Sequence, residues 1–180
     1  MPTVLTILPE GFEEIEAITP IDLWRRAGFE VKTASLSSAT AVVGRSGVKI
    51  AADSALATIG NQTTFDLLFL PGGPGVARLR ESPEVIEIVG RHAIADKWIA
   101  AICAAPLVLH DAGLLSGRHY TAHPSANSEL PQIRTDENVV VDGKIITSRG
   151  AGTAMEFSLR VITLLAGEEL ANKIRLSICA

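Results

Sequence analysis

Residues 97–106 read Lys-Trp-Ile-Ala-Ala-Ile-Cys-Ala-Ala-Pro, an apolar run that ends in a cysteine among small residues. The run 98–102 is typical of a buried parallel strand, and residues 104–112 predict a following helix that stops at Gly113. Ala101 and Ala105 flank Cys103 at the spacing of a nucleophile elbow, a sharp turn between a strand and a helix. The stretch therefore predicts an α/β fold with a cysteine at the carboxyl end of one strand.

The same alternation continues along the chain. Strands are predicted at 4–8, 30–36 and 66–70, and helices at 13–27, 83–94 and 153–165. Short hairpins are expected at 42–51 and at 138–147, the second around Asp142-Gly143. Pro20 predicts a kink or a restart in the first helix, and no helix is expected beyond Ile174. This order predicts one layered α/β domain over residues 1–180, with a mostly parallel sheet.

Composition narrows the class of protein. Of the 180 residues 47% are apolar and only 4% aromatic, which predicts a globular, aliphatic core. With a net charge of −4, the chain has neither the positive field that attracts nucleic acid nor a polybasic patch for binding a membrane surface. Cys103 and Cys179 are too few and too far apart for a disulfide framework, and no signal peptide or membrane-length apolar run is visible. We therefore expect a cytoplasmic protein without membrane contact.

Cys103 has two interpretations that spacing alone leaves about evenly matched: a buried structural thiol or a reactive one. A helix beginning at Ala104 would direct free N–H groups at the sulfur and lower the pKa of the thiol. Gly72-Gly73 ends the strand 66–70, so the Gly73 N–H is placed to join the Ala104 N–H in an oxyanion hole. Taken alone, that glycine pair predicts only a turn.

Five ordered segments carry a resemblance to a known family. They are residues 9–16 (Pro-Glu-Gly-Phe-Glu-Glu-Ile-Glu), 70–73 (Leu-Pro-Gly-Gly), 100–106 (Ala-Ala-Ile-Cys-Ala-Ala-Pro), 121–124 (Thr-Ala-His-Pro) and 147–153 (Thr-Ser-Arg-Gly-Ala-Gly-Thr). Together they resemble the motifs of the DJ-1/ThiJ/PfpI superfamily, with the bacterial, YajL-like members of the DJ-1 branch looking closest. The resemblance implies a flavodoxin-like three-layer sandwich of the class I glutamine amidotransferase type.

The resemblance also implies site residues. Cys103 would be the nucleophilic and redox-active cysteine, Glu16 a protonated acid that hydrogen-bonds its sulfur, and His123 a nearby general acid or base. Gly73 and Ala104 would supply backbone N–H groups. Further residues would shape the pocket or a homodimer contact along the first helix: Glu13, Gly72, Arg26, Arg149 and Thr153. The family needs no cofactor, and no metal-ligand motif occurs in the chain.

Two departures from the family pattern stand out. Residues 43–48 read Val-Gly-Arg-Ser-Gly-Val, so Arg45 is one place early and the expected second cysteine is absent. Ala151 stands where proline is common, which predicts a less rigid loop. The missing cysteine removes a partner for disulfide exchange, and a short C-terminus predicts an open pocket. The part played by Cys179 is undetermined, and we expect a bystander.

Three functions follow as hypotheses. The first is an enzyme acting on α-oxoaldehydes or their protein adducts: a glutathione-independent glyoxalase or protein deglycase whose partners are small reactive carbonyls or glycated proteins. The second is a redox-sensing chaperone whose Cys103 is oxidised to sulfinate. The third, a protease or amidotransferase-like activity, is weak because Ala104 follows the cysteine where proteolytic relatives typically carry histidine.

Overall fold

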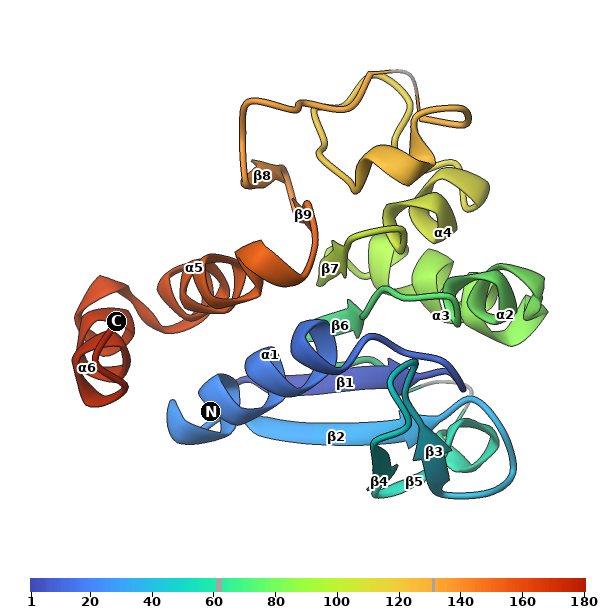
Figure 1. Ribbon diagram of the computed structural model, residues 1–180, viewed down its shortest axis with the longest axis horizontal. Helices are drawn as coiled ribbons and strands as arrows, with labels where there is room; N and C mark the ends of the chain where they lie inside the picture. The colour runs from blue at the N-terminus through green and yellow to red at the C-terminus, as the bar shows by residue number, and fades with distance from the viewer. Residues whose placement is uncertain (61–62, 131) are drawn as a thin grey trace.

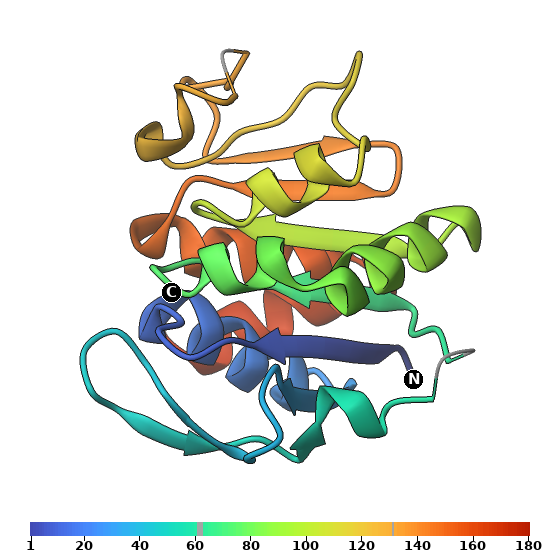
Figure 2. The same cartoon turned by 90° about the vertical axis from the view of Figure 1, so that its right-hand side faces the viewer.

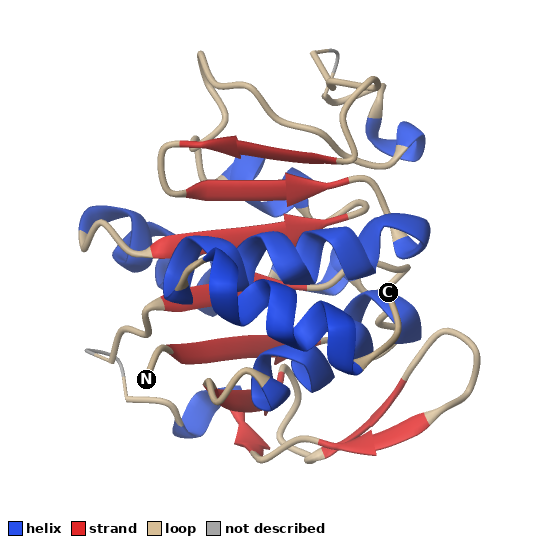
Figure 3. Ribbon diagram, turned by 90° about the vertical axis from the view of Figure 1, so that its left-hand side faces the viewer, coloured by secondary structure: helices blue, strands red, loops and turns tan. Residues whose placement is uncertain are grey.

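A computed structural model describes residues 1–60, 63–130 and 132–180. The strands of its main sheet are β1 (Thr3–Leu8), β2 (Glu30–Ser35), β5 (Ser54–Ala55), β6 (Leu67–Leu70), β7 (Trp98–Ile102), β8 (Val139–Asp142) and β9 (Ile145–Ser148). They lie in the order β5-β2-β1-β6-β7-β9-β8, and all are parallel except β8, which runs against β9 (Figure 3). The strands β3 (Ala41–Val43) and β4 (Lys49–Ala51) form a separate antiparallel hairpin.

Helices cover both faces of this sheet. One layer holds α1 (Glu14–Arg26), α5 (Ala154–Ala166) and α6 (Glu168–Ser177), and the other holds α2 (Val76–Glu81), α3 (Pro83–Ile94) and α4 (Pro106–Asp111), as Figures 1 and 2 show. Short 3-10 turns occupy Leu56–Thr58, Pro124–Ala126 and Ala151–Thr153. The central order β2-β1-β6-β7-β9 is that of flavodoxin, so the expected three-layer, mostly parallel fold is confirmed.

Each face of the sheet has its own apolar core. Under α1 and α5, the buried rings of Trp24, Phe69 and Phe157 pack together, with the Trp24 and Phe69 centroids 5.0 Å apart in an edge-to-face arrangement. Under α3, the core is aliphatic and includes Val85 and Ile88. These two layers hold the strands rigidly and bring the carboxyl ends of β1, β6 and β7 to one edge.

Several element boundaries correct the sequence expectations. Helix α1 continues through Pro20 without a restart, and α4 begins at Pro106 rather than at Ala104. The helix predicted at 153–165 was expected to be the last one, which is wrong, because α6 follows Gly167 and buries Ala171 and Ile174. Few of its residues are apolar and many are charged, so its sequence carries little hydrophobic signal. Helix α2 was also missed, since its six residues follow directly after a glycine-rich turn.

Within the described residues, no helix combines the length and apolar character that crossing a bilayer requires.

Candidate active site

Cys103 sits in a strained turn at the end of β7. Its φ of +66° lies in the left-handed region, which costs a residue with a side chain roughly 1–3 kcal/mol. The turn is fixed by two backbone hydrogen bonds: Cys103 N–H donates to Ser148 O at 2.9 Å, and Ala105 N–H donates to Ile102 O at 3.0 Å. The side chain is half-buried. The turn therefore has the geometry of a nucleophile elbow, as the flanking alanines predicted.

Glu16 lies in the first turn of α1 and is only 2% exposed. Its Oε2 faces Gly72 and the Cβ of Cys103, and it is buried without a hydrogen bond to another described group. The pKa of Glu16 is raised to about 7, mainly by burial and to a smaller extent by the charge of Glu13. The Cys103 side chain and the N–H groups of Gly72 and Ala151 lower that pKa in part. A carboxyl group that keeps its proton near neutral pH therefore borders the thiol.

Gly72 and Gly73 bring three segments together because neither has a side chain. A methyl group on Gly72 would collide with Glu16 Oε2 and Cys103 Cβ. Gly73 has a φ of +97°, and a Cβ there would lie 2.6 Å from Glu13 N. Gly72 O also accepts a hydrogen bond from Glu13 N–H at 2.9 Å. The glycine pair is thus required for the close approach of the loop before α1 to the cysteine turn.

The ionisation of Cys103 differs from the sequence expectation. The pKa of the thiol is raised to about 12, mainly by burial and then by the negative charge and hydrogen bond of Glu16, although the N–H groups of Gly73 and Ala104 act to lower it. A lowered pKa was expected from a helix dipole, but α4 begins only at Pro106, and the Ala105 N–H is bonded within the turn. The two groups therefore hold a single negative charge between about pH 7 and pH 12.

His123 is held beside the cysteine turn through its backbone. Its N–H donates to Cys103 O at 2.8 Å, and the Cδ2 edge of its exposed ring faces Gly150. The ring Nδ1 contacts Ser125 Oγ at 2.9 Å and accepts from Ser125 N–H at 3.2 Å. The ring is thus engaged by Ser125, as expected for a nearby histidine rather than a tight triad partner.

Thr153 fixes the loop that closes the site beside Glu16. Its hydroxyl donates to Gly150 O at 2.8 Å, accepts from Gly150 N–H at 3.2 Å and contacts Ser148 Oγ at 2.6 Å. Gly150 in turn adjoins both Glu16 Oε1 and the His123 ring. Thr153 therefore fixes the Gly150 loop beside Glu16 and His123. Arg149 is half-buried and donates its N–H to Asn138 O at 3.3 Å.

The hairpin β3–β4 supports the acidic segment before α1. Arg45 N–H donates to Phe12 O at 2.8 Å, and Glu14 Oε1 accepts from Ser46 N–H at 2.8 Å. The Glu13 carboxylate caps α1 by accepting from Glu16 N–H at 2.8 Å. These contacts set the position at which the Glu16 side chain enters the core. Arg45 itself is exposed, and its backbone rather than its charge makes the contact described.

Two sequence candidates lie away from the cysteine. Arg26 is ten residues beyond Glu16 on α1, or about 15 Å along the helix axis, and pairs with Asp22 at 2.8 Å. Cys179 is exposed near the C-terminus. His92, in contrast, is fully buried, with Nδ1 2.8 Å from Ile88 O and Nε2 accepting from Phe65 N–H at 3.1 Å. His92 is therefore a structural residue.

Sequence reasoning missed three contributors: Ser148, Gly150 and Ala151. Ser148 O accepts a hydrogen bond from Cys103 N–H, and Gly150 borders Glu16. The Ala151 N–H acts to lower the pKa of Glu16. The available signal was a Gly-Ala-Gly loop directly after a predicted strand, a pattern that fails as a dinucleotide-binding motif but still marks a close backbone approach.

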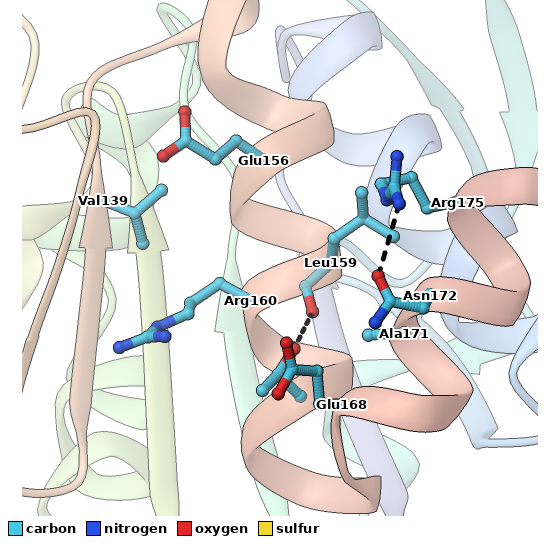
Figure 4. Close-up of a pocket in the computed structure, with 9 residues that line it drawn as sticks. Val139, Glu156, Leu159, Arg160, Glu168, Ala171, Asn172 and Arg175 are labelled. Carbon is cyan, nitrogen blue, oxygen red and sulfur yellow. Dashed lines mark hydrogen bonds between the residues drawn. The ribbon is translucent and has the colours of Figure 1, made fainter. Parts of the chain in front are cut away.

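A separate cavity of about 320 Å³ lies between α5 and α6 (Figure 4). Glu156, Arg160 and Arg175 are among its lining residues, and no residue of the cysteine turn lines it. Among the residues that the structure describes, no group of histidine, cysteine and acidic side chains is arranged to hold a metal ion. The chemistry-bearing cluster is thus the one formed by Glu16, Gly72, Gly73, Cys103 and His123.

Comparison with known proteins places this cluster in a family. Residues 2–164 match the DJ-1/PfpI family. Protein dj-1beta of Drosophila melanogaster is 40% identical over 96% of this chain and 94% of its own length. The glutathione-independent glyoxalase DJR-1.2 of Caenorhabditis elegans is 37% identical over 98% and 95%, respectively. The structure of oxidised DJ-1 from Toxoplasma gondii superposes with a TM-score of 0.94, at 36% identity over 99% of this chain and 98% of that one. The chain therefore belongs to the DJ-1/PfpI family.

Proposed function

We propose that this protein is a cysteine-dependent enzyme that converts 2-oxoaldehydes to 2-hydroxy acids without glutathione. The observation that carries the proposal is the contact between buried Glu16 and Cys103 in its strained turn. A thiol and a carboxyl group that share one charge supply a nucleophile and an acid together. A relative named a glutathione-independent glyoxalase, 37% identical, supports the same reaction class.

The first chemical step is addition of the Cys103 thiolate to the aldehyde carbon. The carbonyl electron pair becomes an alkoxide, which takes the proton of Glu16 and leaves a hemithioacetal and a Glu16 carboxylate. The N–H groups of Gly73 and Ala104 already act on the sulfur, so they are placed to stabilise the developing oxyanion beside it. No external acid is needed for this step.

The second step moves hydrogen between the two substrate carbons. The Glu16 carboxylate removes the C–H proton of the former aldehyde carbon, and an enediol forms. Glu16 returns the proton to the neighbouring carbon, while His123 moves the hydroxyl proton from the first oxygen to the second. The product is a thioester of Cys103, which water cleaves to the 2-hydroxy acid and the free thiol. The net reaction is 2-oxoaldehyde plus water to 2-hydroxy acid.

The test is lactate formation from methylglyoxal by protein purified from a host that lacks its own glyoxalases. Wild type should release lactate in many turnovers, and Cys103→Ala should release none above the uncatalysed rate. Cys179→Ala is the matched control, because it removes the exposed cysteine and should retain full activity. Equal turnover by wild type and Cys103→Ala would refute the proposal. Release of free thiol from a hemithioacetal-modified peptide, or of free amine from a peptide glycated at lysine, would extend the same chemistry to a deglycase.

Redox sensing is a second proposed function of the same cysteine. Two equivalents of peroxide oxidise a thiolate to sulfinate and yield two waters. The protonated Glu16 and the N–H groups near the sulfur are suited to hold the sulfinate oxygens. The Toxoplasma gondii relative is a DJ-1 protein whose structure was solved in an oxidised form, which is in line with this chemistry.

We also propose a cytoplasmic homodimer that pairs through α1. Ile15 and Ile18 are 53% and 39% exposed on one face of this helix, where a second copy would cover them. Size measurement in solution tests the pairing, and a monomer would refute it. Ile15→Glu should favour the monomer if α1 forms the contact.

A further inference from the structure

One guanidinium joins the far ends of the three segments that surround Cys103. Helix α2 follows the Gly72-Gly73 turn, α4 follows Cys103, and residues 124–130 follow His123. Arg80 lies one residue before the end of α2, Asp111 ends α4, and Glu129 lies six residues after His123. The Arg80 side chain binds both of these carboxylates.

The two pairings are bidentate. Arg80 Nε and Nη2 donate to Asp111 at 2.6 and 3.0 Å, and Nη1 and Nη2 donate to Glu129 at 2.9 and 2.6 Å. The Arg80 and Asp111 side chains are only 27% and 28% exposed, so solvent screens this pair less than one on open surface. The planar fork of arginine fixes both the distance and the plane of each carboxylate, which a lysine ammonium does not.

A short chain of backbone hydrogen bonds connects Glu129 to His123. Glu129 N–H and Leu130 N–H donate to Ala126 O at 3.0 and 2.8 Å, and Ala126 N–H donates to His123 O at 2.9 Å. His123 N–H then donates to Cys103 O at 2.8 Å. Ala126 and Leu130 are fully buried anchors of this segment. Glu129 and His123 therefore belong to one hydrogen-bonded segment that is also bound to the cysteine turn.

We propose that Arg80 is a positioning residue that holds the His123 segment over Cys103. The inference rests on the proposed function, in which His123 moves a substrate proton. The ion pair with Asp111 fixes the guanidinium relative to the cysteine turn. The ion pair with Glu129 fixes the histidine segment relative to the guanidinium. Arg80 thus sets the distance between two reacting groups without touching the substrate.

The kinetic test is a double-mutant cycle between Glu129→Gln and His123→Ala, with methylglyoxal as substrate. Glu129→Gln leaves the Arg80–Asp111 pair in place and should lower kcat on the order of tenfold, because small misplacements of a reacting group are costly, with KM nearly unchanged. In the His123→Ala background the same change should have no further effect on kcat. Equal losses in both backgrounds, or no loss in either, would overturn the proposal.

A structural readout separates this proposal from the proposed enzymatic function. The chain has four histidines, and His123→Ala assigns the His123 ring signals in NMR spectra. Arg80→Gln and Glu129→Gln should shift those signals, whereas the buried His92 ring should keep its position. Arg25→Gln, which removes the separate pair with Asp53, is the matched control and should leave His123 unchanged. If wild type forms no lactate but the His123 signals shift, the enzymatic proposal alone fails; unchanged His123 signals refute the positioning role.

Discussion

Replacing Glu16 by glutamine should make the protein more stable at neutral pH and should flatten the pH dependence of its unfolding. The carboxyl pKa rises from an ordinary value of 4.5 to about 7 in the folded protein, mainly because the group is buried. A raised carboxyl pKa means that the folded state favours the protonated form. The free energy of unfolding therefore falls as pH rises from 4.5, and this loss is complete above about pH 7. At about 1.4 kcal/mol per pKa unit, the shift is worth about 3 kcal/mol.

The assay is urea unfolding of wild type and Glu16→Gln at half-unit steps from about pH 4.5 to about pH 8, under reducing conditions. The free energy of unfolding of wild type, relative to the variant, should fall by about 3 kcal/mol across this range. Cys103→Ala should keep most of the wild-type slope, because burial rather than the thiol is the main cause of the raised pKa. A wild-type-to-variant difference that stays constant with pH would refute the buried, protonated carboxyl.

Three further outcomes follow from the site. Gly72→Ala should destabilise the protein by about 1–3 kcal/mol, because the methyl group meets Glu16, Cys103 and, at 2.9 Å, Ile102 O. Gly90→Ala is the control and should not destabilise it, because the space around its Cβ position is open. Equal urea-unfolding midpoints for the two variants would contradict the packing around Gly72. Thr153→Val should lower the free energy of unfolding by about 1–2 kcal/mol and loosen the Gly150 loop, because the hydroxyl bonds to both Gly150 O and Gly150 N–H. Hydrogen exchange at the Gly150 N–H measures the loosening, and unchanged protection would contradict this role of the hydroxyl. Limited peroxide should add two oxygens to Cys103 before Cys179 is modified, and mass spectrometry that finds Cys179 oxidised first would count against the redox role.

The sheet could be predicted because its strands depend on patterns within each segment. Apolar runs predicted β1, β6 and β7, and Asp142-Gly143 predicted the hairpin of β8 and β9. Helix α6 could not be predicted in the same way. Only Ala171 and Ile174 are buried in it, so its stability comes from packing against α5 rather than from its own sequence.

The residues of the candidate site could be predicted from the sequence, but the direction in which the thiol pKa shifts could not. The elbow spacing and the family motifs identified Cys103, Glu16, Gly73 and His123. The direction of the thiol pKa shift depended on how deeply Cys103 is buried and on how close Glu16 lies to it, and both are tertiary properties. Arg80 carries no local signal, since its carboxylate partners lie 31 and 49 residues away in the sequence.

The central claim is that Glu16 and Cys103 act as one unit that acquires a single negative charge near pH 7, which the carboxylate and the thiolate share. The most direct measurement is the rate of Cys103 alkylation by iodoacetamide against pH, followed by mass spectrometry in a Cys179→Ala background. Wild type should show an inflection near pH 7, because the thiolate holds part of the shared charge. Glu16→Leu should lack this inflection and react more slowly at about pH 7, because its thiol is left without the carboxyl group in a buried position that raises its pKa. Faster alkylation of Glu16→Leu at about pH 7 would show that Glu16 is instead a fixed negative charge that suppresses the thiolate, and would contradict the claim.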